Sequence, residues 1–246
     1  MAISTNSIIH YTSTFDVLKL ILKEGFKIKY CLESLKLGAT GDGSNAAHPM
    51  ISFCDIPLSD AERHFDAYGR YGIGLTKKWA MKNGVNPVLY IDKNSLIAKS
   101  IYELIKARRD KASNLTDEQK SRILEIKSYA KNYAGELKRG GINKSDYRFY
   151  DEREWRLVAP KDKIKASFSV LPSEYLADKD KYNNNISSCR FTFNPNDISY
   201  IIVDKTSEIP DMVNFLRNEY RKKCTAEELD VLLSKICSTE QIIADY

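Results

Sequence analysis

The chain contains no apolar run that approaches the ~20 residues which a membrane-spanning helix needs. Its first residues also lack the basic start and apolar core of a secretory signal peptide. These absences predict a cytoplasmic protein that does not insert into a membrane. No G-x-G-x-x-G motif follows the first expected strand, which argues against a Rossmann-type dinucleotide site.

Clustered metal ligands and cysteine pairs are also missing. The cysteines are Cys31, Cys54, Cys189, Cys224 and Cys237. Because they are odd in number, widely separated and without a C-x-x-C pair, we expect reduced thiols rather than a disulfide framework. His48 and His64 have only Cys54 near them, and this spacing is unlike that of zinc sites. The sequence therefore predicts no metal.

A length of 246 residues, 43% of them hydrophobic, allows one large domain or a domain with an appendage. The net charge of +5 is concentrated between Lys99 and Arg148, where thirteen basic residues face seven acidic ones. This excess fits a phosphate-bearing or acidic partner, although a solvated helical face is the simpler alternative. Candidate nucleic-acid-binding residues in this segment are Arg108, Arg109, Lys120, Arg122 and Lys127.

Strand patterns occur early and late in the chain, and helical patterns separate them. Strands are expected at 8–12, 50–54, 71–75, 87–91, 155–159, 166–171, 190–193 and 200–203, and helices near 13–25, 95–141, 212–222 and 225–236. This irregular order predicts an α+β fold rather than a doubly wound sheet. We expect one domain over residues 1–204, with a basic helical insert at about 95–145, and a C-terminal helical appendage over 205–246.

The stretch Asp151-Glu-Arg-Glu-Trp-Arg carries the clearest chemical signal. On an extended strand, Glu152 and Glu154 would point to one side while Trp155 anchors the other side in the core. Near the other end of the chain, His10 follows the apolar Ile8-Ile9. An imidazole and two carboxylates around one hollow suit the binding of a ribose and the stabilisation of a cationic sugar. The alternatives are a charged strand edge, with the arginines paired to nearby acids, and a histidine satisfied within a buried strand.

Five segments spread along the chain carry a family resemblance. They are Ile51-Ser-Phe-Cys-Asp-Ile-Pro, Tyr71-Gly-Ile-Gly-Leu-Thr-Lys-Lys-Trp-Ala, Asn86-Pro-Val-Leu-Tyr-Ile, Phe149-Tyr-Asp-Glu-Arg-Glu-Trp-Arg and Ser238-Thr-Glu-Gln-Ile-Ile-Ala-Asp-Tyr. Together they resemble the AbiGi family of abortive phage-resistance proteins. That family's usual label is the antitoxin half of a two-gene phage-exclusion pair. The resemblance therefore implies a non-catalytic module that neutralises a partner toxin or binds DNA at its own promoter.

A second resemblance starts from His10-Tyr-Thr-Ser, followed by the helical pattern 18–22 and Gly25. These residues resemble the opening of ADP-ribosyltransferases of the DarT and tRNA 2′-phosphotransferase groups. This implies split antiparallel sheets with a nicotinamide site in the cleft between them, and NAD as the substrate without a metal. ADP-ribose would go to RNA, DNA or a protein, or to water in a glycohydrolase.

The transferase resemblance assigns roles to particular residues. Glu154 would stabilise the oxocarbenium-like sugar, Glu152 would act as general base for the acceptor, and His10 would hold a ribose hydroxyl. The residues that bind NAD would be His10, Tyr11, Thr12, Tyr71 and Tyr68. In the first hypothesis the chain is thus a phage-defence toxin that an antitoxin holds in check. In the second it is the antitoxin or binding module itself.

Overall fold

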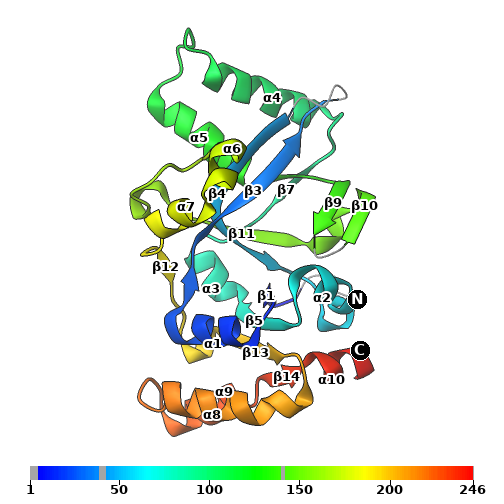
Figure 1. Ribbon diagram of the computed structural model, residues 1–246, viewed down its shortest axis with the longest axis vertical. Helices are drawn as coiled ribbons and strands as arrows, with labels where there is room; N and C mark the ends of the chain where they lie inside the picture. Colours follow the sequence, from blue (N-terminus) through cyan, green and yellow to red (C-terminus); the bar gives the residue numbers. More distant parts are fainter. Residues whose placement is uncertain (1–4, 39–42, 140–141, 246) are drawn as a thin grey trace.

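The structure is a computed structural model that describes residues 5–38, 43–139 and 142–245 (Figure 1). The strands are β1 (Ser7–Thr12), β2 (Phe26–Lys27), β3 (Lys29–Lys36), β4 (Gly43–Cys54), β5 (Tyr71–Thr76), β6 (Asn86–Pro87), β7 (Leu89–Ile91), β8 (Ala130–Asn132), β9 (Gly135–Arg139), β10 (Ile142–Tyr147), β11 (Glu154–Val158), β12 (Arg190–Phe191), β13 (Ile198–Val203) and β14 (Ile236–Ser238). The helices are α1 (Phe15–Glu24), α2 (Glu62–Tyr68), α3 (Lys77–Lys82), α4 (Leu96–Arg109), α5 (Asp117–Ser128), α6 (Pro172–Ala177), α7 (Lys179–Asn185), α8 (Ile209–Tyr220), α9 (Ala226–Leu233) and α10 (Thr239–Asp245). The expected α+β class is confirmed.

One eight-stranded sheet forms the centre of the described residues. Its order is β14-β13-β5-β1-β4-β11-β6, and β3 pairs with β4 beside this path. All neighbours are antiparallel except β13 and β14, which run parallel. The predicted pair of split sheets is not formed here. The long β4 prevents it, because this strand pairs with β3 over Gly43–Met50 and with β11 over Met50–Cys54.

Both faces of the central strands are buried. Successive side chains of a strand point to opposite faces, so Ile8 of β1 enters the main core while Ile9 enters a second, smaller core. Helices α1, α3 and α8 contribute side chains to the main core. Phe65 of α2 and Ile242 of α10 contribute to the smaller one. In β4, Phe53 belongs to the main core and Cys54 to the smaller one, so Ser52 shares the face of Cys54.

The predicted insert is helical only in its first part. Helices α4 and α5 pack together over a third core, which also contains Leu35, Ile91 and Ala130 (Figure 1). The expected helix is wrong from residue 130 onward, where β8 pairs with β7 and β9 pairs with β10. Tertiary pairing decides the structure here, and residues 140–141 lie outside the described part. The expected strand at 166–171 is also wrong, because only Val170 makes a bridge, with Ala47.

Residues 205–245 supply α8, α9, β14 and α10 at one end of the molecule (Figure 1). The C-terminal helices were expected, but β14 and α10 were not. Strand β14 extends the main sheet through Val203↔Ser238 and its neighbours. The proposed domain boundary at residue 204 thus stays a prediction. Among the described residues, no helix has the length and apolar character to span a membrane.

Candidate functional site

Strand β11 brings the late carboxylate into the sheet. Glu154 lies opposite Cys54 and Arg156 lies opposite Ser52. Because paired residues of neighbouring strands point to the same face, the side chains of Glu154 and Arg156 share the face of Ser52. The backbone N–H of Glu154 donates to the hydroxyl of Tyr90 over 2.7 Å, which fixes the start of the strand.

Glu152 does not lie on this strand, which corrects the expected extended Glu-x-Glu pair. It ends a short 3₁₀ helix, Phe149–Glu152, and Arg153 then takes a left-handed conformation with φ 48°. The backbone carbonyl of Arg153 accepts from the N–H of Asp55 over 3.0 Å. Few residues other than glycine adopt this conformation, because it crowds the side chain against the backbone. The turn nevertheless returns the Glu152 carboxylate to the neighbourhood of Glu154.

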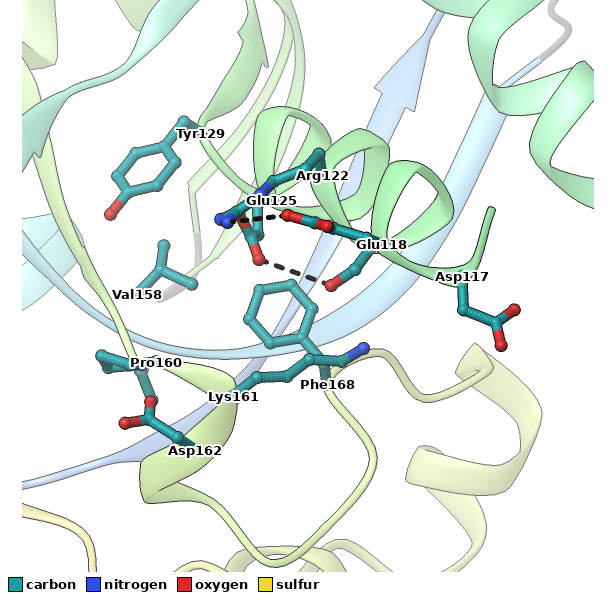
Figure 2. A pocket seen from close by; sticks show the side chains of 12 residues that line it. Asp117, Glu118, Arg122, Glu125, Tyr129, Val158, Pro160, Lys161, Asp162 and Phe168 are labelled. Atoms are coloured by element: carbon teal, nitrogen blue, oxygen red, sulfur yellow. Dashed lines mark hydrogen bonds and ion pairs between the residues drawn. The ribbon is translucent and has the colours of Figure 1, made fainter. Parts of the chain in front are cut away.

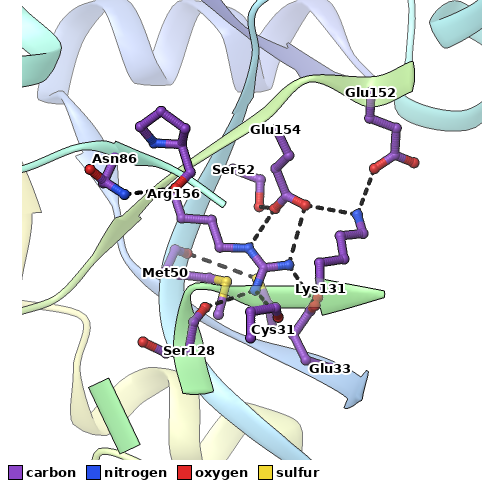
Figure 3. A network of polar contacts seen from close by, with 12 residues as sticks. Cys31, Glu33, Met50, Ser52, Asn86, Ser128, Lys131, Glu152, Glu154 and Arg156 are labelled. Carbon is purple, nitrogen blue, oxygen red and sulfur yellow. Dashed lines mark hydrogen bonds and ion pairs between the residues drawn. The ribbon is translucent and has the colours of Figure 1, made fainter. Parts of the chain in front are cut away.

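Two cations and three carboxylates meet at this point (Figure 3). We call Glu33, Lys131, Glu152, Glu154 and Arg156 the charge cluster. Arg156 donates to Glu154 over 2.8 Å and to Glu33 over 2.6 Å. Lys131 of β8 lies 2.5 Å from a carboxylate oxygen of Glu152 and 2.7 Å from one of Glu154. The cluster therefore joins β3, β8 and β11 with the turn before β11.

Glu152, Glu154 and Arg156 are buried, whereas Lys131 and Glu33 are half-buried, and the polar atoms of Arg156 and Glu154 are engaged by protein groups. Arg156 is fully buried, and its guanidinium also donates to the carbonyl of Ser128 over 2.7 Å. Glu154 is 5% exposed, and one of its carboxylate oxygens accepts from Arg156 and from the Ser52 hydroxyl, the latter over 2.6 Å. The other oxygen accepts from Lys131 and from Arg156. A ribose hydroxyl could reach this carboxylate only by displacing one of these donors.

Burial and ion pairing act against each other on the charges of this cluster. Burial alone would raise the pKa of Glu154, but the adjacent Arg156 and Lys131 outweigh it and hold the pKa well below its ordinary value. Burial would likewise lower the pKa of Lys131, yet Glu154 and Glu152 raise it above its ordinary value. Glu154 is thus a carboxylate whose charge is already neutralised by protein cations.

His10 lies on the opposite face of the sheet from Glu154, so the predicted shared hollow is not formed. Its ring packs edge-on against Phe26 and Phe53, with centroids 5.3 and 5.8 Å away. Its Nδ1 atom lies 2.8 Å from the backbone carbonyl of Ser52. Burial lowers the pKa of His10, so the ring is neutral near pH 7. This is the alternative of a histidine satisfied within the sheet.

The predicted nicotinamide-binding residues are divided between the two faces. Tyr11 is buried against Phe65 on the face opposite to His10. Thr12 is buried, and Tyr71, opposite it on β5, donates its hydroxyl to Glu208 over 2.8 Å. Tyr68 alone of these residues contacts a predicted acid, because its hydroxyl donates to Glu152. The described geometry does not assemble the residues around a nicotinamide.

Four of the five candidate nucleic-acid-binding residues have side chains that are paired or buried within the protein, and Lys120 contributes its backbone carbonyl to one of these contacts. Arg108 donates to the carbonyl of Lys120 over 3.2 Å, and Arg109 donates to the Ser44 hydroxyl over 2.9 Å. Arg122 pairs with two glutamates of its own helix. Lys127 is buried, which lowers its pKa to about 8. Much of the positive charge read from this segment therefore serves internal contacts.

Sequence reasoning missed Lys131, Glu33 and Ser52. Lys131 falls in the segment that the pattern predicts to be helical, although it lies on β8 with its side chain 15% exposed. Glu33 is on β3, far from Arg156 in sequence. No short motif links these residues, because the fold alone brings them together. In the described part of the chain, no group of three or more His, Cys, Asp or Glu side chains could hold a metal ion.

Comparisons with known proteins point to one family. A family model described as "Putative abortive phage resistance protein AbiGi, antitoxin" matches residues 24–204, which contain the whole charge cluster but not His10. A protein of Lactococcus lactis subsp. cremoris named "Abortive phage resistance protein AbiGi" is 26% identical over 220 residues, covering 80% of this chain and 88% of that protein. No solved structure matches the chain.

Proposed function

Because the chain belongs to the AbiGi family of abortive phage-resistance proteins, we propose that it is an antitoxin that binds and neutralises a partner toxin. The observation that carries this proposal is the family match, whose description includes the word antitoxin. In this proposal the protein acts by occupying a surface of the toxin, and it needs neither a cofactor nor a metal. The complex would form in the cytoplasm, where phage replication takes place.

The charge cluster supports a structural rather than a catalytic use of the late carboxylates. Glu154 and Glu152 bind protein cations through short hydrogen bonds, and Glu154 also accepts a hydrogen bond from the Ser52 hydroxyl. Buried ion pairs of this kind fix the relative positions of strands, because separating them leaves an unpaired charge in the core. Strands that are held in fixed positions give the protein a rigid surface, which suits recognition of a partner.

Co-expression tests the proposal. Cells that express the toxin of the pair alone should stop growing, and cells that also express this chain should grow. Expression of this chain alone should leave growth unchanged. A chain that is itself toxic, or that fails to rescue growth while accumulating as folded protein, would refute the antitoxin role.

The rival hypothesis is ADP-ribosyl transfer from NAD, with Glu154, Glu152 and His10 as the catalytic groups. The ion pairs of Glu154, and the position of His10 on the other face of the sheet, count against it. Binding of RNA or DNA has little support either, since Arg109 and Arg122 are engaged within the protein. Incubation of the purified chain with NAD, with and without the toxin, should give no nicotinamide. Nicotinamide release would favour the rival.

A further inference from the structure

A groove of about 640 Å³ lies between α5 and residues 158–168 (Figure 2). Its apolar surface comes from Val158 and Pro160 at the end of β11, from Phe168 beyond them, and from Tyr129 at the end of α5. Phe168 is itself 5% exposed and belongs to the main core. The groove therefore has a rigid apolar base that is continuous with the interior of the protein.

The rim of the groove is acidic. Four carboxylates line it, from Asp117, Glu118, Glu125 and Asp162, against the two cations of Arg122 and Lys161. Arg122 pairs with Glu125 over 2.8 Å and with Glu118 over 3.5 Å, so its positive charge is already paired with carboxylates of the rim. The side chain of Glu118 is still 79% exposed. This local negative charge contrasts with the net charge of +5 for the whole chain.

Building on the proposed antitoxin role, we infer that this groove receives a segment of the toxin in which an apolar side chain is flanked by Lys or Arg. The apolar side chain packs against Phe168, Val158 and Pro160, and becomes the desolvated anchor that dominates such interfaces. The basic neighbours meet Glu118 and Asp162 on the two walls, where opposite charges select the partner and speed its association. The phosphates of a nucleic acid would be repelled by the same carboxylates.

Charge reversal on the rim tests this inference. The double variant Glu118→Lys with Asp162→Lys places cations on both walls of the groove. The matched control is Glu227→Lys with Asp230→Lys, which changes the net charge equally on exposed positions of α9, at the far end of the molecule (Figure 1). Titration calorimetry with the purified toxin of the pair gives the Kd of each protein. Unfolding curves verify that both variants keep the stability of the natural chain.

We expect the rim variant to bind the toxin about tenfold or more weakly, and the control variant to bind like the natural chain. Raising the salt concentration should weaken the natural complex and leave less difference between the two variants. If the natural chain binds the toxin and the rim variant binds equally well, the groove inference is wrong and the antitoxin role stands. If the natural chain does not bind, both fail.

A second copy of the chain is the other candidate occupant of the groove, and light scattering on the purified protein distinguishes it. The inference predicts that the rim variant and the natural chain have the same oligomeric state. A natural dimer that the rim variant converts to monomers would assign the groove to self-association and overturn the inference.

Discussion

At Glu154, one buried carboxylate meets Arg156 and Lys131, which come from β11 and β8. Replacing it with glutamine keeps the shape of the side chain but removes the negative charge that both cations share. We expect Glu154→Gln to lower the free energy of unfolding by about 3–5 kcal/mol, since breaking a buried pair leaves an uncompensated charge. Urea denaturation measures this change. Glu136→Gln, at an exposed position of β9, is the control and should leave the midpoint unchanged. An equal midpoint for both variants would remove the structural role.

Lys127 provides a pH-dependent test at the same scale. Burial, aided by the charges of Arg109 and Arg108, lowers its pKa from 10.5 to about 8. The folded state therefore gives up this proton more readily than the unfolded state, so the buried charge costs stability below pH 8 and the cost fades as the pH rises towards 10.5. We expect Lys127→Met to stabilise the protein at pH 7 by about 1–3 kcal/mol. This advantage should shrink between pH 8 and pH 10.5.

Unfolding curves of the natural chain and the Lys127→Met variant across this pH range give the difference directly. Lys106→Met, at an exposed position of α4, serves as the control and should show no such pH dependence. A difference for Lys127→Met that stays constant from pH 7 to pH 10.5 would contradict the account of this residue.

Single elements were predictable where the signal is local. Thr116 with Gln119, and Thr225 with Glu228, form the capping boxes that the sequence indicates, and α5 and α9 begin there. The first helix was expected from near residue 13 and begins at Phe15, because Thr14 caps it by accepting from the N–H of Val17. Residues 166–171 do not form a strand, because only Val170 finds a backbone partner, Ala47 of β4. Local propensity does not show whether a segment has a strand to pair with.

Local sequence signals do not predict the charge cluster. Glu152 and Glu154 were found as a pair, but their partners Lys131 and Glu33 lie on other strands. The pattern also placed His10 and Glu154 around one hollow. The structure puts them on opposite faces of the sheet, and the pairing register that decides this cannot be seen in a local pattern. Ser52 lies between them, with its carbonyl near His10 and its hydroxyl bonded to Glu154.

Gly69 and Gly84 allow a test of how closely the end of α2 packs against β1. Both have positive φ, at 107° and 72°, so a side chain at either position strains the backbone. At Gly84 an added Cβ would meet open space, whereas at Gly69 it would lie 2.2 Å from the carbonyl oxygen of Thr12. We expect Gly69→Ala to cost about 1–3 kcal/mol more than Gly84→Ala, because β1 must move away from the end of α2. Thermal unfolding compares the two. Equal losses of stability would mean that backbone strain, and not the contact with Thr12, determines the cost.

At the scale of the whole molecule, the charge cluster joins the eight-stranded sheet to β8 and to the turn before β11, and α4 and α5 lie at the opposite end from α8 and α9 (Figure 1). This arrangement presents surfaces for binding, and the proposed antitoxin uses them without turnover. Its effect on a toxin must therefore scale with the number of molecules present.

Titration of toxin activity with the purified chain, in the presence and absence of NAD, tests this most directly. For an antitoxin that acts by binding, toxin activity should fall in proportion to the added protein and vanish at a fixed stoichiometric ratio, with or without NAD. Complete loss of toxin activity at a small fraction of that ratio, dependent on NAD, would show catalysis and contradict the account.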